Sequence, residues 1–228
     1  MAGPEALAFD LYGTLVDPIR IWTRLEQSVP DKALRIAEVW RHKQLEYTFR
    51  LTAMGQYEDF EQVTRKALDY ALAAAGHELT ADQRDALLAQ YDDLERFPDV
   101  ELGLTRLQQR GHTMVVFSNG SPRMLDAVMD AAGLRPYFEA YVSVDEVRQY
   151  KPAPATYRLA AERLGRPIGE VRLVSANPFD DIGAEAAGMR AAWVDRSGGL
   201  FDTLRPPPQL VVRSLTELAD VLERSAGA

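Results

Sequence analysis

The sequence predicts an α/β protein: a Rossmann-like parallel sheet flanked by helices, with an inserted cap subdomain that is entirely helical. Two observations support this fold class. Short apolar runs alternate with helical patterns, and three of those patterns stop at a glycine that suits the end of a helix. The alternation is interrupted once, from about residue 19 to residue 97, by successive helical patterns with no convincing strand. Because alternating strands and helices are typical of a parallel sheet, the long helical stretch is predicted to be an insertion.

The strands are predicted from short apolar runs that end in small or polar residues. They comprise residues 7–10, 113–118, 140–144, 171–175 and 191–194, with a weaker sixth strand at 210–212. Between most of these runs lie helical patterns, at 122–132, 153–164 and 180–187, and they stop at Gly133, Gly165 and Gly188. A glycine in this position can adopt the left-handed conformation that ends many helices.

The insertion is predicted to contain three helices. Residues 32–50 and 56–75 have the apolar spacing of helices, and Thr80 with Gln83 forms a capping box that opens a third. Pro18 and Pro98 bracket the stretch. We therefore assign residues 1–17 and 98–228 to the core and residues 18–97 to the cap. An insertion just after the first strand lies over the carboxyl edge of the sheet, where it can act as a lid.

Composition narrows the function classes. The 228 residues suffice for one domain with an insertion, and the formal net charge of −8, without a basic stripe, argues against nucleic acid binding. The absence of cysteine excludes disulfides, thiolate metal sites and cysteine nucleophiles. No apolar run approaches the roughly 20 residues of a membrane span. The first strand begins within about five residues, which leaves no room for a signal peptide. We therefore expect a cytoplasmic protein.

Each predicted strand end carries a polar group. Asp10 ends the first strand, Ser118 and Asn119 end the second, Lys151 follows the third after a short loop, and a polar stretch from Ser175 follows the fourth. The carboxyl ends of parallel strands converge on one crevice, so these side chains are expected to lie together. Any one of them alone is an ordinary turn or helix cap, but the four together indicate a site.

These residues carry a resemblance to a known family. The segment FDLYGTLVDP at residues 9–18 resembles the first motif of the haloacid dehalogenase superfamily, and the four polar strand ends match its four motifs in order. The resemblance implies that Asp10 is a covalent nucleophile and that Thr14 holds its surroundings by hydrogen bonding. The segment at residues 39–48 is very similar to a cap helix of the L-2-haloacid dehalogenases, in which an arginine receives the departing halide. Arg41 matches that arginine.

The resemblance also assigns roles to the other strand-end residues. Lys151 keeps the nucleophile ionised by lowering its pKa, and Asp180 positions or deprotonates the hydrolytic water, although the neighbouring Asp181 has a weaker claim to that role. Ser175 and Asn177 support the water. The remaining candidates are substrate-binding residues: Leu11, Tyr12, Leu45, Phe60, Ser118, Asn119, Tyr157 and Phe179. Of these, Ser118 holds the substrate carboxylate, Asn119 assists with the halide and Tyr157 supports Lys151 and the substrate side. An ordinary surface pairing of Arg41 with Glu38, and a purely packing role for the aromatic side chains, are the alternatives.

Two positions separate this chain from the phosphatases of the superfamily. Tyr12 stands where those enzymes carry a proton-donating aspartate, and Ala176 stands where they carry an aspartate that holds Mg²⁺. A methyl group cannot bind magnesium, which prefers oxygen ligands. Halide ions leave without a general acid, so both losses are compatible with carbon–halogen cleavage. The resemblance therefore implies an (S)-2-haloacid dehalogenase that needs neither a metal nor an organic cofactor.

Three alternatives remain open at this point. The chain could hydrolyse another activated 2-substituted acid, such as fluoroacetate or a strained cyclic imino acid. It could be a Mg²⁺-dependent phosphatase of small molecules, which Tyr12 and Ala176 oppose. It could be a binding protein without activity, which the complete set of strand-end residues opposes. The expected partners are a small 2-haloacid and a halide ion, with neither nucleic acid nor membrane, and related enzymes are often homodimers. Phe179 replaces a bulkier aromatic residue, which leaves the halide preference open.

Overall fold

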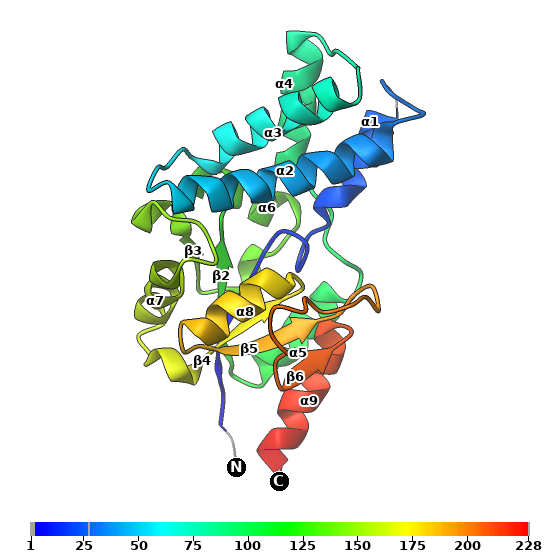
Figure 1. The fold of residues 1–228 in the computed structure, drawn as a ribbon. Coiled ribbons are helices and arrows are strands. Elements are labelled where there is room, and N and C mark those ends of the chain that lie inside the picture. Colours follow the sequence, from blue (N-terminus) through cyan, green and yellow to red (C-terminus); the bar gives the residue numbers. More distant parts are fainter. Residues whose placement is uncertain (1–2, 27, 228) are drawn as a thin grey trace.

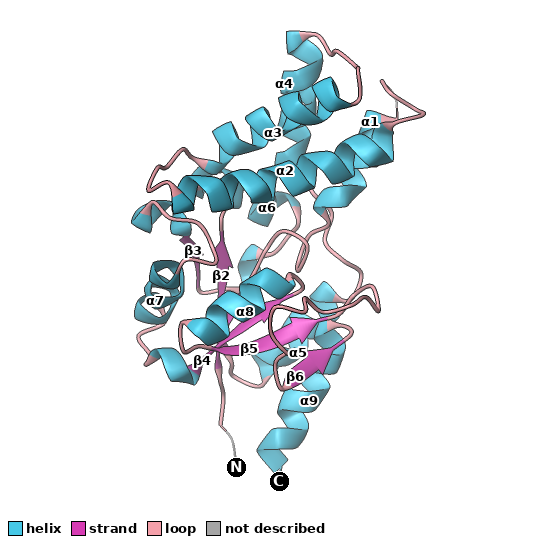
Figure 2. Cartoon of the chain, viewed as in Figure 1, coloured by secondary structure: helices cyan, strands magenta, loops and turns pink. Residues whose placement is uncertain are grey.

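The computed structural model describes residues 3–26 and 28–227 (Figures 1 and 2). Six parallel strands form one sheet in the order β3-β2-β1-β4-β5-β6. The strands are β1 (Ala6–Phe9), β2 (Thr113–Ser118), β3 (Ala140–Ser143), β4 (Val171–Ser175), β5 (Arg190–Val194) and β6 (Leu210–Val212). All six predicted strands are therefore present within one residue of their expected bounds, and the predicted α/β fold class is confirmed.

The central position of β1 brings the polar strand ends together. All four residues of β1 are buried, as expected for a strand covered on both faces. Phe9 is level with Val116 of β2 and with Val174 of β4, and the backbone N–H of Asp10 donates to the carbonyl of Val174 at 3.0 Å. The strands on both sides of β1 thus end beside Asp10.

Five helices belong to the segments that the sequence assigns to the core (Figure 1). They are α5 (Val100–Gln109), α6 (Pro122–Ala131), α7 (Pro154–Arg163), α8 (Pro178–Ala186) and α9 (Leu215–Gly227), with short 3-10 turns η3 (Arg135–Tyr137), η4 (Val144–Val147) and η5 (Ile168–Glu170). The helix expected at 180–187 begins earlier, because Pro178 fits the first helical position, where no N–H is needed. Asp180 therefore lies in the first turn of α8, two residues after its start.

The segment predicted to be the cap consists of helices that lie over the carboxyl edge of the sheet (Figure 2). They are η1 (Pro18–Ile21), α1 (Trp22–Leu25), α2 (Ala33–Ala53), α3 (Phe60–Ala74), α4 (Ala81–Ala89) and η2 (Gln90–Asp92). The helix expected from residue 56 begins at Phe60, because the Asp59 side chain accepts the N–H of Gln62 and sets the first turn there. The capping box of Thr80 and Gln83 is present as predicted. In the described part of 18–97 no strand forms, apart from a single bridge of Arg96 to Val16.

Side-chain contacts hold these helices against the rest of the chain. Phe49 of α2 meets Phe179 of α8 edge to face, with ring centroids 5.2 Å apart. The Tyr57 hydroxyl donates to Asp145 at 2.5 Å, and the Tyr150 hydroxyl donates to the carbonyl of Glu58 at 2.6 Å. These contacts join the end of α2 and the segment between α2 and α3 to the rest of the chain. Within the described residues, no helix has the length and apolar character needed to cross a membrane.

The packing of α5 on α9 provides a test of the fold. A Cβ added at Gly103 of α5 would lie 2.5 Å from Leu215 Cβ and 2.7 Å from its carbonyl carbon. Alanine normally stabilises a helix interior by about 0.5–1 kcal/mol relative to glycine, but overpacking here should cost about 1–3 kcal/mol. We expect Gly103→Ala to lower the free energy of unfolding measured in urea. The exposed Leu102→Ala is the control, with a change within about 0.5 kcal/mol. A stabilised Gly103→Ala protein would contradict the close packing of the two helices.

Candidate active site

Asp10 lies at the carboxyl end of β1, and its two carboxylate oxygens have different surroundings. Oδ2 accepts from Thr14 Oγ1 at 2.9 Å and from Asn177 Nδ2 at 2.7 Å, with Ser175 Oγ further away at 3.5 Å. Oδ1 accepts from Lys151 Nζ at 3.1 Å and from no other described residue. The turn that follows needs a positive φ of 91° at Gly13, which glycine adopts without strain. Oδ2 is therefore held in place, while Oδ1 retains a free lone pair.

Lys151 joins the nucleophile candidate to the second carboxylate. Its ammonium donates to Asp10 Oδ1, to Asp180 Oδ2 at 2.8 Å and to the carbonyl of Phe117 at 2.7 Å, so all three N–H bonds are used. Only 1% of its surface is exposed. Burial by itself lowers the pKa of Lys151, but the charges of Asp10 and Asp180 outweigh it and the pKa is raised. Lys151 is thus a permanent cation between two carboxylates.

Asp180 is completely buried in the first turn of α8. Burial raises its pKa, the charge of Lys151 opposes that effect, and the net direction is upward. Tyr157 donates its hydroxyl to Asp180 Oδ1 at 2.7 Å, and burial followed by the charge of Asp180 keeps the pKa of Tyr157 well above its usual value. The expected contact of Tyr157 with the substrate stays a prediction. The side chain has no exposed surface and supports Asp180, because the adjacent Gly183 leaves room for the hydroxyl.

Arg41 reaches the site from α2. Its Nη2 donates to the carbonyl of Tyr12 at 3.3 Å, and its Nη1 donates to Gln44 Oε1 at 2.7 Å. Among the described residues it forms no ion pair, so the alternative pairing with Glu38 is absent. The guanidinium therefore lies over the turn that follows Asp10.

Ser118 and Asn119 lie at the end of β2, both buried. Ser118 Oγ accepts the N–H of Gly120 at 3.1 Å, and Asn119 Oδ1 accepts the backbone N–H of Lys151 at 3.0 Å. These bonds fix the loop beyond β2 against the Lys151 segment. The Nδ2 of Asn119 remains as a donor within the site, since its oxygen is already used.

The residues predicted to form the apolar walls of the substrate site differ in their burial and in their contacts. Tyr12 packs against Phe60 and Tyr91, with ring centroids 5.8 and 5.6 Å away, and its hydroxyl has no partner. Leu11 is buried, whereas Leu45 is partly exposed. Phe179 is partly buried against Phe49, as described above. Burial raises the pKa of Tyr12 well above its usual value, so it stays protonated and cannot replace an acidic proton donor.

Sequence reasoning missed a set of polar residues behind Arg41. Gln44 is fully buried and contacts Arg41, Tyr91 and Thr64. The spacing of Gln44, three residues after Arg41 on one helix, was the available signal. Tyr91 lies in η2, far along the chain, and only the folded structure brings it to Gln44.

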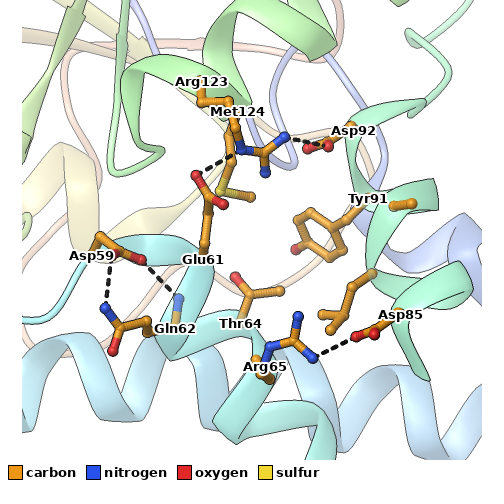
Figure 3. A pocket seen from close by; sticks show the side chains of 12 residues that line it. Asp59, Glu61, Gln62, Thr64, Arg65, Asp85, Tyr91, Asp92, Arg123 and Met124 are labelled. Atoms are coloured by element: carbon orange, nitrogen blue, oxygen red, sulfur yellow. Dashed lines mark hydrogen bonds and ion pairs between the residues drawn. The ribbon is translucent and has the colours of Figure 1, made fainter. Parts of the chain in front are cut away.

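A sizeable cavity on the cap side does not include Asp10. It measures about 400 Å³ and lies between α3, the α4–η2 segment and α6, with Tyr91 and Thr64 in its wall (Figure 3). Arg123 of α6 crosses it to pair with Glu61 and Asp92. The space around Asp10 is closed, since Asp10 is only 7% exposed. Within the described part of the chain, no three acidic, histidine or cysteine side chains group as metal ligands.

Asp181, the weaker candidate for the role of Asp180, lies in surroundings that its sequence position did not indicate. It has no exposed surface, and neither oxygen has a hydrogen-bond partner. Burial, followed by the charges of Asp180 and Asp10, raises its pKa well above the usual value. Protonation is therefore favoured in the folded protein, and ionisation of Asp181 costs stability.

The pH dependence of stability tests this interpretation. A raised folded-state pKa means no penalty below the unfolded pKa near 3.8 and a growing penalty as the pH rises toward the folded value. We expect Asp181→Asn to become progressively more stable than the wild type as pH increases, by at most about 1.4 kcal/mol per pH unit. Urea unfolding at pH 4.5, 6.0 and 7.5 measures the difference. Exposed Asp31→Asn is the control. A difference that stays constant with pH would show that Asp181 titrates normally.

Comparison with known proteins shows the family of this chain. The haloacid dehalogenase-like hydrolase family matches residues 4–188. The chain is 37% identical, over 98% of its length and 96% of the relative, to an (S)-2-haloacid dehalogenase of Pseudomonas sp. strain YL. It is 39% identical, over 91% of its length and 93% of the relative, to haloacetate dehalogenase H-2 of Moraxella sp. strain B.

A solved structure extends the comparison to three dimensions. The L-2-haloacid dehalogenase of Xanthobacter autotrophicus, with chloropropionic acid covalently bound, superposes with a TM-score of 0.88 at 34% identity, and the match covers 96% of this chain and 98% of that one. The family match and the two relatives each cover most of the chain. This chain therefore belongs to the haloacid dehalogenase-like hydrolases.

Proposed function

We propose that the protein hydrolyses short (S)-2-haloalkanoic acids to (R)-2-hydroxy acids through an ester of Asp10. The observation that carries this proposal is the asymmetry of the Asp10 carboxylate, with one oxygen held by Thr14 and Asn177 and the other directed to Lys151. The covalent chloropropionic acid complex of the Xanthobacter autotrophicus relative supports the same type of intermediate.

In the first step, Oδ1 of Asp10 attacks carbon 2 from the side opposite the halogen. A carbon–oxygen bond forms while the carbon–halogen bond breaks, and the halide leaves with the bonding electrons, which inverts carbon 2. Arg41 and the amide of Asn119 receive the halide. Ser118 and backbone N–H groups at the strand ends hold the substrate carboxylate. Leu11, Tyr12, Leu45, Phe60 and Phe179 form the apolar walls.

In the second step, water attacks the carbonyl carbon of the Asp10 ester and transfers a proton toward Asp180. Negative charge develops on Oδ2, the oxygen that already accepts from Thr14 and Asn177, with Ser175 nearby. The ester bond to Oδ1 then breaks, Asp180 returns the proton to Oδ1, and the hydroxy acid leaves with that oxygen, while the oxygen of the water remains in the carboxyl group of Asp10. Lys151 stabilises both carboxylates throughout, and Tyr157 orients Asp180.

The same residues account for the proposed independence from metal and cofactor. The ammonium of Lys151 already supplies the cation between Asp10 and Asp180, and Ala176 provides no oxygen ligand in its side chain. A halide is weakly basic, so the missing proton donor at Tyr12 costs little. We propose that residues 18–97 act as a cap that limits the site to the substrate and the hydrolytic water. A cytoplasmic homodimer is the accompanying proposal.

Halide release from the separate enantiomers tests the reaction class. We expect release from L-2-chloropropionate alone, at the same rate with and without EDTA, because Asp10 can approach only one face and no metal takes part. An ion-selective electrode gives the rate directly. Activity abolished by EDTA and restored by Mg²⁺ would contradict the interpretation of Tyr12 and Ala176. If neither enantiomer releases halide but the protein turns over non-halogenated 2-substituted acids, those acids are its substrate class instead.

Isotope labelling tests the covalent step. In a single turnover in ¹⁸O-water, the first hydroxy acid should contain unlabelled oxygen, since that atom comes from Asp10. Asp10→Asn should reduce turnover by at least about 10⁴-fold while the free energy of unfolding changes little. Mass spectrometry of the variant checks that deamidation has not restored the aspartate. Label in the first product would mean that water attacks carbon 2 directly.

A further inference from the structure

Gln44 occupies an unusual place for a polar side chain. It lies on α2 one turn after Arg41, with no exposed surface, and both its amide oxygen and its amide nitrogen form hydrogen bonds with neighbouring side chains. A buried amide without hydrogen-bond partners would cost stability, so the contacts of Gln44 are what make its burial here tolerable. Those contacts lead to Arg41 on one side and to Thr64 and Tyr91 on the other.

Thr64 determines which end of the amide faces Arg41. Its hydroxyl donates to the carbonyl of Phe60 at 2.6 Å, so its hydrogen is used and its oxygen can only accept. Gln44 Nε2 donates to that oxygen at 2.7 Å. The NH₂ end of Gln44 is therefore fixed on Thr64, and the Oε1 end must face Arg41.

Both lone pairs of Gln44 Oε1 are occupied. Arg41 Nη1 donates to it at 2.7 Å, and the Tyr91 hydroxyl donates at 3.0 Å. Burial raises the pKa of Tyr91, so its hydroxyl remains a donor. Thr64 and Tyr91 also border the cavity in Figure 3, although both are almost fully buried. Burial and these hydrogen bonds together keep both side chains next to Gln44.

We propose that Gln44, oriented by Thr64 and Tyr91, is a positioning residue that holds the Arg41 guanidinium toward the leaving halide without neutralising its charge. A carboxylate in this place would also orient Arg41, but it would cancel the charge that attracts the anion. A neutral acceptor orients the group and leaves the charge intact. This inference rests on the proposed role of Arg41 in the dehalogenation.

Gln44→Leu removes the acceptor while keeping a similar volume. We expect kcat for L-2-chloropropionate to fall about 10- to 100-fold, since small displacements of a reacting group have effects of that size. The decrease should be smaller for the bromo acid, because bromide is the better leaving group and needs less assistance. A purely structural role would lower both rates by the same factor. Exposed Gln109→Leu carries the same substitution away from the site and should match the wild type.

Three further variants test whether the acceptor for Arg41 must be neutral and whether Thr64 fixes the orientation of the Gln44 amide. Gln44→Glu keeps an acceptor for Arg41 but adds a negative charge, so it should lose at least as much chloro-acid activity as Gln44→Leu. Thr64→Val removes the oxygen that fixes the amide, and Thr64→Ser should restore the chloride-to-bromide rate ratio of the wild type. Gln44→Glu with wild-type rates would overturn the argument that a neutral acceptor is required.

A binding measurement separates failure of this inference from failure of the proposed function. Titration with sodium bromide, followed by fluorescence of the buried Trp40 next to Tyr91, reports halide binding without turnover. Gln44→Leu should weaken bromide binding about tenfold or more. The role of Gln44 would be overturned if the wild type releases halide and Gln44→Leu has the same chloride-to-bromide rate ratio and the same bromide affinity as the wild type. A wild type that neither releases nor binds halide would instead refute the proposed function, and with it this inference.

Discussion

The site depends on the ammonium of Lys151 between the carboxylates of Asp10 and Asp180. Both carboxylates are nearly or fully buried, and two like charges in such surroundings repel strongly unless a cation lies between them. Lys151 also donates to the carbonyl of Phe117 at the end of β2, so one side chain ties together β1, β2 and the start of α8. Loss of Lys151 would leave two buried carboxylates without a cation and should be strongly destabilising, so this ammonium is structural as well as chemical.

The two cations of the site are held in opposite ways, and the difference follows from their proposed tasks. Lys151 is surrounded by anionic and carbonyl oxygens, which suit a charge that must stay fixed while bonds change around it. Arg41 is held by the neutral oxygens of Gln44 and Tyr12, so its charge is not cancelled and several N–H donors stay available. The arrangement of Arg41 stabilises a leaving anion, because the positive charge stays available. The arrangement of Lys151 stabilises a nucleophile and a base that must remain ionised.

The sequence predicted the sheet and the convergence of its polar ends because both depend on local pattern. Buried strands read as apolar runs, and parallel strands end at one edge, so Asp10, Lys151 and Asp180 could be placed together without a structure. The start of α3 was misplaced because the Asp59 cap overrides the apolar spacing before it. Gln44 and Tyr91 were missed because their partnership joins residues 47 positions apart, and the burial of Tyr157 behind Asp180 depends on the space left at Gly183.

The balance of charge around Asp10 explains why Asp181 must be protonated. Asp10 and Asp180 contribute two negative charges, and Lys151 and Arg41 contribute two positive ones, so the four groups together are neutral. In the proposed reaction a 2-haloacid enters as an anion, and its charge is stabilised by the Ser118 hydroxyl and by backbone N–H groups at the strand ends. An ionised Asp181 would place a second uncompensated charge beside them, in surroundings where neither of its oxygens has a donor. Burial that raises the pKa of Asp181 therefore favours the neutral form, which adds no further negative charge near the proposed site of an anionic substrate.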